Sequence, residues 1–575
     1  LSLALASRKL VKSKCLVRSM DAAETIGCVT VICSDKTGTL TKNQMNIEHF
    51  VLAQEEDCSD KKAFFALHEF WPVAFAVNST AELQDEREVV GSSTEGAFLL
   101  ALASAGIDYR KIREAHPVVE RVPFRSDTKW MSTTVAIDVH HHHFIKGAPE
   151  GILEKCRKVE TAAGIADFSE EMRGRFEAGI KEAADQAMRT LAFARREPGS
   201  DDFVLMGVAA IADPVREEIP SALATCRKAG ISVKMITGDN PVTATAIARR
   251  IGLLSEGDLV LTGELFEMMS DEEVSSILTS LKVIARSRPA DKKRLVELLQ
   301  KAGETVAVTG DGTNDAPALK QADVGLSMGI AGTEVAKEAS DLVLLDDNFA
   351  TILEGIRWGR TLYQNIQRFV QFQLTVNVAA LAIALFGPFI GVELPLTAVQ
   401  LLWVNIIMDT LAGLALGSEL PRKGIMDQTP IKRDASIVTP NMATVIGITS
   451  LYFFLVLSLL LKFPLGANPQ TFFFTAFVFF QIWNELNARS LDLSSAFQQL
   501  RENGGFLGVM GLIVVVQVLL VNFGGAVFRT VPMGLSDWGV ALLLTSSVLI
   551  LAEAIRFALR LATPREEKGK VPQEA

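Results

Sequence analysis

The sequence predicts an α/β protein in two parts: a soluble half built on a doubly wound parallel sheet, and an all-α half that crosses a membrane. In the soluble half, up to about residue 360, short β-branched runs that end in small polar loops alternate with helical patterns. Beyond it, long apolar runs recur with few charges, and 49% of the 575 residues are hydrophobic. Such an apolar content is high for a wholly soluble chain.

The net charge and the cysteines limit which partners and which cellular compartment fit this chain. A net charge of −10, with no basic block interleaved with aromatic residues, argues against a nucleic-acid partner. The six cysteines lie in the soluble half without paired spacing or histidine partners, which is typical of reduced cytosolic thiols. No signal peptide is visible: an apolar stub from Leu1 runs into Arg8 and Lys9, so we expect residues 1–24 to be the end of a truncated membrane helix and a stalk.

The first catalytic candidate follows the run Val29–Ile32, which reads as a buried parallel strand. It delivers Asp35 into a loop of small polar residues, at the edge where open α/β sheets bind ligands. A carboxylate beside Lys36 and three threonines, Thr37 included, suits a nucleophile that accepts a phosphoryl group. The alternative, a strand ending in a polar turn, explains single residues but not the whole string from Asp35 to Thr41.

Between residues 50 and 205 the strand-then-loop signatures with acidic residues vanish, which indicates an inserted domain. In this insertion an adenine ring could stack on Phe124, with Lys129 and Lys146 near the phosphates of a nucleotide. Taken singly, a phenylalanine in such a stretch is more often a core residue, and a lysine more often a surface residue, than a nucleotide contact. The run His140–His143 lacks acidic or cysteine partners, so we expect a solvated loop there and no metal site.

Two further loops follow the insertion. Thr237, Gly238 and Asp239 end a strand and lead into a helix over 241–251, so Thr237 and the Gly238 amide can hold phosphate oxygens near a helix N-terminus. The stretch from Ala285 to Lys293 opens another helix, and one of its lysines can neutralise a phosphoaspartate. We favour Lys292 for this role.

The last loop carries two carboxylates, Asp311 and Asp315, on a tight glycine turn. Magnesium usually takes one or two protein carboxylates, so Asp311 with Asp35 would satisfy it, while Asn314 and Asp315 orient the loop. A lone loop of this kind could be a simple turn. Four such loops in order, each after an apolar strand, favour a phosphoryl-transfer site.

The membrane half begins with a predicted stalk helix over 346–369 that continues into the bilayer. Six apolar spans of membrane-crossing length follow, at about 370–390, 396–416, 442–463, 471–488, 506–527 and 538–558. Basic residues concentrate in the loops after the second, fourth and sixth spans, which places both ends of this half, including the tail 559–575, in the cytosol.

The second span holds Asn405 and Asp409, which share one face of a helix. An acid at this depth is costly unless it meets a cation or a partner, and oxygen ligands point to a hard cation. A polar contact between helices is the alternative. Gln481, Asn484 and Glu485 in the fourth span fit an interfacial helix end equally well and are left out of the ion site.

Four stretches, DKTGTLT, KGAPE, TGDN and TGDGTNDAPALK, resemble the signatures of the P-type ion-pumping ATPases. The resemblance implies a haloacid-dehalogenase-like Rossmann phosphorylation domain over 25–49 and 206–345. It implies an inserted α+β nucleotide-binding domain over 50–205 and a six-helix transmembrane bundle over 370–558. It also implies ATP and magnesium as cofactors.

Residue roles follow from the same resemblance. Asp35 matches the residue phosphorylated by ATP, Thr37 a carbonyl ligand of magnesium, and Asp311 the metal carboxylate. The other matches to the phosphorylation site are Lys36, Thr237, Gly238, Asp239, Lys292, Asn314 and Asp315. The matches to the nucleotide site are Glu95, Phe124, Lys129, Lys146, Arg189 and Arg286. Related phosphatases carry an acid where Thr37 stands, so a longer-lived acyl phosphate is expected.

Asn405 and Asp409 fall on ligand positions of the calcium-pumping members. Pumps that bind two calcium ions place a glutamate where Ala380 stands, so the chain looks more like the plasma-membrane class, with calcium as the exported ion. We expect a multi-pass protein of the plasma membrane or a vacuolar or other endomembrane, with cytosolic soluble domains. The short tail is too little to support calmodulin as a partner.

Complete pumps begin with an actuator domain and four earlier membrane helices, and we expect these parts to be missing here because the sequence opens on what resembles the end of the fourth helix. We therefore expect it to bind ATP, to form a phosphoenzyme inefficiently and not to transport alone. Two alternatives stay open: a membrane-anchored haloacid-dehalogenase-like phosphatase, and a non-enzymatic remnant that associates with a full pump.

Overall fold

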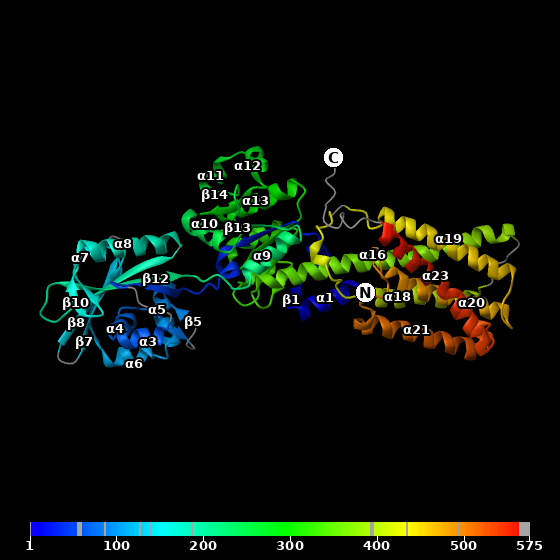
Figure 1. The fold of residues 1–575 in the computed structure, drawn as a ribbon, viewed down its shortest axis with the longest axis horizontal. Coiled ribbons are helices and arrows are strands. Elements are labelled where there is room, and N and C mark those ends of the chain that lie inside the picture. Colours follow the sequence, from blue (N-terminus) through cyan, green and yellow to red (C-terminus); the bar gives the residue numbers. More distant parts are fainter. Residues whose placement is uncertain are drawn as a thin grey trace.

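A computed structural model describes residues 2–54, 60–84, 88–125, 128–137, 140–186, 188–390, 396–432, 435–492 and 494–562. The molecule is elongated, with three parts arranged along its long axis (Figure 1). A β-rich unit lies at one end, an α/β unit in the middle and a bundle of long helices at the other end. The chain leaves the central unit for the β-rich unit, returns, and then enters the bundle.

The central unit is an eight-stranded sheet in the order β1-β18-β17-β16-β2-β13-β15-β14. All of its pairings are parallel except that of β1 with β18, as the sequence predicts for a buried α/β sheet. Its strands are β1 Cys15–Val17, β2 Val31–Asp35, β13 Ser232–Ile236, β14 Leu259–Thr262, β15 Leu281–Ala285, β16 Val306–Gly310, β17 Val324–Met328 and β18 Leu342–Leu344. β2 begins two residues later than predicted and includes Asp35 as its last residue.

Apolar clusters lie against both faces of this sheet, and helices cover them. The helices are α2 Met20–Thr25, α9 Ile219–Lys228, α10 Pro241–Arg250, α11 Gly263–Met268, α12 Asp271–Ile277, α13 Pro289–Lys301, α14 Ala316–Gln321 and α15 Glu334–Ala339. α10 and α13 confirm the two helices predicted after the Thr237 and Arg286 loops. Both begin with proline, whose missing N–H costs nothing in a first helical turn.

The β-rich unit has a sheet in the order β10-β9-β12-β11-β8-β7-β6, with β3 also paired to β12. Its strands are β3 Asn46–Val51, β6 Val118–Val122, β7 Trp130–Ile137, β8 His140–Gly147, β9 Cys156–Thr161, β10 Gly164–Asp167, β11 Arg189–Arg196 and β12 Phe203–Ala212. A small hairpin, β4 Glu82–Gln84 and β5 Glu88–Val90, stands apart from it. β3 and β12 are the strands by which the chain enters and leaves the unit.

Among its described residues the β-rich unit also has six helices, namely α3 Lys61–Leu67, α4 Phe70–Val77, α5 Ser93–Ser104, α6 Tyr109–Ala115, α7 Pro149–Lys155 and α8 Glu170–Asp185. The predicted loop at His140–His143 is wrong, because these residues begin β8. They pair in register with β7, and His143 Nδ1 lies 2.9 Å from Thr134 Oγ1. The pairing with β7 therefore holds these residues in a strand although their four side chains are polar.

The predicted stalk and first span form one helix, α16, from Phe349 to Phe386. Its 38 residues span about 57 Å, so it runs from the sheet unit through the bundle without a break (Figure 1). It packs against the turn Ile26–Cys28, where Gly359 and Gly27 approach so closely that a Cβ on Gly359 would lie 2.5 Å from the Gly27 nitrogen. The N-terminal helix α1, Ser2–Lys12, also packs against α16.

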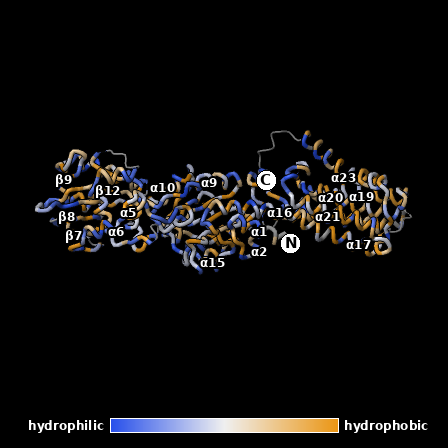
Figure 2. The backbone as a smooth tube through the Cα atoms, turned by 90° about the horizontal axis from the view of Figure 1, so that it is seen from below, coloured by the Kyte–Doolittle hydropathy of each residue, from blue (hydrophilic) through white to orange (hydrophobic). Residues whose placement is uncertain are grey.

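The remaining bundle elements are α17 Ala398–Asn405, α18 Ala412–Gly417, α19 Pro440–Lys462, α20 Pro469–Ala488, α21 Gly504–Phe523, α22 Gly525–Phe528 and α23 Leu535–Ala562. Figure 2 shows hydrophobic positions recurring along these helices. Within the described residues, four helices are long and apolar enough to cross a membrane: α16, α19, α21 and α23. The polar residues predicted near the end of the fourth span lie inside α20, and a π-helical turn interrupts the second span.

The close contact between Gly27 and Gly359 makes Gly359→Ala a test of the packing of α16. A methyl group has no room there, so we expect the substitution to destabilise the fold by about 1–3 kcal/mol and to lower the melting temperature. Gly447→Ala on α19 is the control, because nothing lies within 4 Å of its Cβ position. Thermal unfolding of the purified chain in detergent measures both; equal melting temperatures would contradict the packing described.

Candidate active site

Three loops that are far apart in the sequence meet at the carboxyl edge of the central sheet. β2 lies between β16 and β13, and both pairings are parallel. Asp35 ends β2 in register with Ile236, so the loop that starts at Thr237 lies beside it. Asp311 directly follows β16 on the other side. The topology thus brings the predicted nucleophile, phosphate loop and metal carboxylate to one place.

Lys292 joins this edge from the first turn of α13. Its Nζ lies 2.7 Å from Asp35 Oδ2 and 2.5 Å from Asp315 Oδ1, and only 6% of its side chain is exposed. Burial alone would lower the pKa of Lys292, but the carboxylates of Asp35 and Asp315 raise it above its usual value. The lysine is therefore a fixed positive charge in contact with the predicted nucleophile.

Asp315 also shapes the loop that carries Asp311. Its Oδ2 accepts hydrogen bonds from the backbone N–H groups of Asp311 and Gly312, each at 3.1 Å. Burial, together with the negative charges of Asp35 and Asp315, raises the pKa of Asp311 to about 6. The carboxylates of Asp35, Asp311 and Asp315 thus lie near the single positive charge of Lys292. The site therefore has an excess of negative charge.

A magnesium ion fits this donor set. Mg²⁺ prefers hard oxygen ligands and needs only one or two protein carboxylates, which Asp35 and Asp311 supply. The loop after β2 reaches the same spot, because a Cβ on Gly38 would lie 2.7 Å from Asp311 Oδ2. Gly38 has a φ of +74°, which favours glycine at this turn. Within the same loop, the Thr37 N–H donates to Asp35 Oδ1 at 3.2 Å.

Lys36 does not pair with Asp35. Its Nζ lies 2.9 Å from Asp239 Oδ2 and 4.0 Å from Asp213 Oδ2, so it ties the β2 loop to the β13 loop. Asp213 was not among the predicted site residues, although it directly follows the long apolar run of β12. It accepts hydrogen bonds from Thr41 Oγ1 at 2.5 Å and from the Gln44 N–H at 3.2 Å. It therefore fixes the far end of the loop that follows β2.

The phosphate-binding candidates are held by their backbone. Thr237 is buried, donates its N–H to the Ile284 carbonyl at 2.9 Å, and accepts the Asp239 N–H on its hydroxyl at 3.2 Å. Gly238 has no atom within 4 Å of its Cβ position, so its backbone borders open space. Asn314 lies on an exposed turn. These loops can thus present N–H groups and a hydroxyl to a phosphate group.

The β-rich unit holds a separate cavity of about 730 Å³. Four predicted nucleotide residues line it, namely Glu95, Phe124, Lys146 and Arg189. Lys146 Nζ lies 2.6 Å from Glu95 Oε1 and also donates to the Asn78 carbonyl. Burial alone would raise the pKa of Glu95, but Lys146 and the Thr80 hydrogen bonds hold it below its usual value. This buried ion pair borders a cavity rimmed by Phe124, which is 57% exposed.

Thr80 was not among the predicted site residues, because no motif marks it. Its N–H and hydroxyl donate to Glu95 Oε2 at 2.6 and 2.8 Å, so it fixes the carboxylate that faces Lys146. Lys129 does not line the cavity. Its side chain is exposed, and its backbone carbonyl accepts the Ala148 N–H at 3.0 Å.

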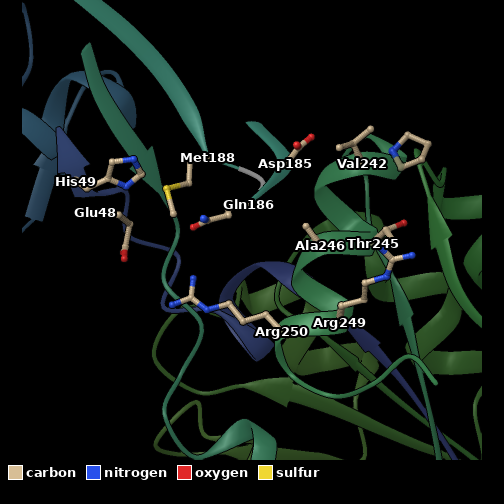
Figure 3. Close-up of a pocket in the computed structure, with 11 residues that line it drawn as sticks. Glu48, His49, Asp185, Gln186, Met188, Val242, Thr245, Ala246, Arg249 and Arg250 are labelled. Carbon is tan, nitrogen blue, oxygen red and sulfur yellow. The ribbon is translucent and has the colours of Figure 1, made fainter. Parts of the chain in front are cut away.

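A second cavity, of about 620 Å³, adjoins the loops after β2 and β13 and is lined by Lys36, Asp239, Arg189 and Arg286. Arg189 and Met188 also line the 730 Å³ cavity, so the two spaces share a wall. A third cavity of about 1080 Å³ lies beside them, between α10 and the β-rich unit (Figure 3). There Arg250 points toward the side that carries Glu48 and Met188.

The predicted ion-site residues lie in the second span. Asn405 ends α17 and is exposed, and the π-helical turn Ile406–Leu411 follows it. Asp409 belongs to that turn, but its side chain lies outside the described atoms. Regular α-helix resumes at Ala412, so the predicted span 396–416 is helical but contains a π-helical turn that the sequence did not indicate. The interruption comes where the sequence places its polar residues.

Phe124→Ala tests the cavity as a nucleotide site. Stacking of a base on an aromatic ring contributes about 1–3 kcal/mol, so we expect ATP binding to weaken about ten-fold without loss of stability, because the ring is largely exposed. Titration calorimetry with ATP measures this. Val119→Ala, an exposed β6 residue away from the cavity lining, should leave the affinity unchanged. Unchanged affinity in Phe124→Ala would contradict the stacking role.

Asp311→Asn tests whether the charge of Asp311, buried beside two other carboxylates, destabilises the fold. Because the pKa of Asp311 rises from 3.8 to about 6, the folded chain binds more protons than the unfolded chain between these values. Its stability without Mg²⁺ therefore falls as pH rises through this window. We expect Asp311→Asn to melt at a higher temperature than the unmodified chain at neutral pH in EDTA, with no difference at pH below about 4. Asp167→Asn, at the exposed end of β10, is the control.

Comparisons with known proteins agree with the geometry. Residues 393–558 match the family model described as cation transporting ATPase, C-terminus, and residues 67–218 match that described as P-type ATPase, cytoplasmic domain N. Calcium-transporting ATPase 4, plasma membrane-type, of Arabidopsis thaliana is 41% identical over 97% of this chain and 57% of its own length. Calcium-transporting ATPase PAT1 of Dictyostelium discoideum is 39% identical over 94% and 54%. The chain spans just over half the length of these relatives.

Proposed function

The chain belongs to the P-type cation-transporting ATPases, and from that premise we propose that it carries the phosphorylation, nucleotide-binding and ion-binding parts of a plasma-membrane-type calcium pump. One observation supports this most: Asp35 ends the strand between β16 and β13, in contact with Lys292. We infer a haloacid-dehalogenase-like fold for the central unit from this arrangement. We also infer that the bundle crosses the membrane six times, with α20 and the interrupted second span as the two polar crossings.

In the proposed reaction an Asp35 carboxylate oxygen attacks the γ-phosphorus of ATP. The new O–P bond forms as the bond to the β-phosphate oxygen breaks, and ADP leaves. Lys292 would neutralise the phosphorylated carboxylate that it already contacts at 2.7 Å. Thr237 and the Gly238 N–H would bind oxygens of the transferred group, because their loop lies beside Asp35.

Magnesium, held by Asp35 and Asp311 with the Thr37 carbonyl, would supply charge neutralisation at the phosphate oxygens. Thr37 has no acidic group to protonate the leaving oxygen or activate a water. The acyl phosphate should therefore persist, which an energy-transducing cycle requires.

The nucleotide would bind across the two adjoining cavities. The base would stack on Phe124 beside the Glu95–Lys146 pair, and the phosphates would extend past Arg189 toward Arg286 and Lys36. Three cationic side chains along this path suit a polyphosphate. Arg189 lines both cavities, so we propose that it contacts the phosphates nearest the nucleoside.

The transported ion would bind at the interrupted second span. Asn405 and Asp409 supply oxygen ligands that suit a hard cation such as calcium. A π-helical turn of this kind shifts the backbone carbonyls and is frequent at functional sites. Calcium as the ion follows from the names of the relatives together with these residues.

Phosphorylation at Asp35 can be tested with labelled ATP and magnesium. We expect acid-stable, hydroxylamine-sensitive labelling of the chain, reduced to background in Asp35→Asn, since the amide cannot attack phosphorus. The control Asp167→Asn should label normally because that residue is exposed at the end of β10. Equal labelling of Asp35→Asn and the unmodified chain would refute the assignment of the nucleophile.

A further inference from the structure

The cavity of about 1080 Å³ beside α10 separates two opposite charges that do not touch (Figure 3). Arg250, the last residue of α10, lies on the side of the central unit, and Glu48 of β3 lies on the side of the β-rich unit. Both side chains are exposed. Among the residues that the structure describes, neither of them forms a hydrogen bond or an ion pair. An arginine and a glutamate without partners thus face the same open space, and the proposed reaction gives neither of them a role.

Glu48 lies at a β-bulge. β3 pairs with β12 through Ile47 and His49, but the register shifts between these two residues, so Glu48 has no partner residue in the ladder. Such an extra residue bends its strand and redirects a side chain, and bulges are frequent beside functional sites. Burial lowers the pKa of Lys61 in α3, and the charge of Glu48 opposes this effect, but no ion pair joins the two side chains in the described part of the chain. The bulge therefore leaves the Glu48 carboxylate available at the cavity wall.

Arg250 is placed to reach across this space. In Figure 3 its side chain points toward the wall that carries Glu48, whereas the side chain of Arg249 points away from that wall. Arg250 also lines the cavity of about 620 Å³ that adjoins the loops after β2 and β13. Its guanidinium, which stays charged at any physiological pH, therefore borders both the proposed phosphate path and the open space in front of Glu48.

Two short segments, residues 42–45 and 213–214, connect the β-rich unit to the central unit. They lie between the strands β3 and β12 and the bridge that pairs Thr41 with Val215. Domain closure commonly takes place in a few residues of this kind, at the ends of packed elements. Bending of these segments would change the width of the cavity and with it the distance between Glu48 and Arg250.

We propose that Glu48 and Arg250 form an ion pair, the latch, that holds the β-rich unit against the central unit while ATP is bound. This pairing rests on the proposed function, in which one nucleotide contacts Arg189 of the β-rich unit and Arg286 of the central unit. The phosphates attract cations of both units, the cavity narrows, and the charges of Glu48 and Arg250 meet. Arg250 is thus a positioning residue, because it acts on the approach of the two units and touches none of the reacting atoms.

Charge reversal tests the latch through the rate at which labelled ATP and magnesium phosphorylate the purified chain at low salt. An exposed ion pair contributes little, so Arg250→Glu and Glu48→Arg should each lower the rate about two- to five-fold. The combined variant restores the pair in reverse order and should return to within about two-fold of the unmodified chain. Arg249→Glu is the matched control, because it makes the same change of charge one residue away, and it should lower the rate by less than about two-fold.

The rescue by the combined variant separates the latch from two other roles of Arg250. A direct contact with the ATP phosphates would slow Arg250→Glu, leave Glu48→Arg unaffected and keep the combined variant slow, and this pattern would overturn the proposal. Equal losses in Arg249→Glu and Arg250→Glu would also overturn it, since they would indicate a general effect of charge on the approach of ATP.

Cross-linking tests the approach of the two units without phosphorylation. In a chain that carries Glu48→Cys and Arg250→Cys, a short bismaleimide should join the two thiols in higher yield when a non-hydrolysable ATP analogue is present. The five cysteines that the structure describes are buried, and the two single variants measure the background. An unchanged yield in a chain that binds the analogue by calorimetry would overturn the latch.

The two arms also separate the latch from the proposed function. A chain whose cross-linking responds to the analogue but which ATP does not phosphorylate would contradict the assignment of Asp35 and support the latch. Failure to bind any nucleotide would overturn the proposed function and the latch together.

Discussion

The contact of Lys292 with Asp35 and Asp315 is the interaction on which the soluble half depends. Each partner comes from a different loop, and Asp311 adds a third carboxylate beside them. Without the lysine this sheet edge would hold buried negative charge with no internal counter-ion, at a cost of about 3–5 kcal/mol. The same positive charge that allows the loops to converge also faces the oxygen that would attack ATP.

α16 links this edge to the membrane. It packs on the turn before β2 through Gly27 and Gly359, and Arg360 donates to the carbonyls of Ala229, Ile425 and Gln428. These contacts join the sheet unit, the helix and the segment after the second span. A displacement of the loops around Asp35 would therefore reach the bundle through one rigid element.

Sequence reasoning placed Asp35, Thr237 and Asp311 correctly at the ends of neighbouring strands, because each lies in a short polar string after an apolar run. The roles of these residues stay predictions. Sequence reasoning failed where a side chain is fixed by a residue distant in the chain: Lys36 pairs with Asp239 rather than Asp35, and Thr80 holds Glu95. The histidines of β8 were misplaced because pairing with β7 is a tertiary effect. The π-helical turn after Asn405 has no periodic signal in the sequence.

The melting temperature of Lys292→Met, recorded against pH without Mg²⁺, tests the central interaction most directly. Lys292 has its pKa raised by its two carboxylate partners, so its stabilising charge is present throughout the range from acid to neutral pH. Its loss should therefore lower the melting temperature strongly at neutral pH, and less in acid, because protonation of carboxyl groups removes their attraction to the lysine. A variant that melts like the unmodified chain at neutral pH would contradict the account.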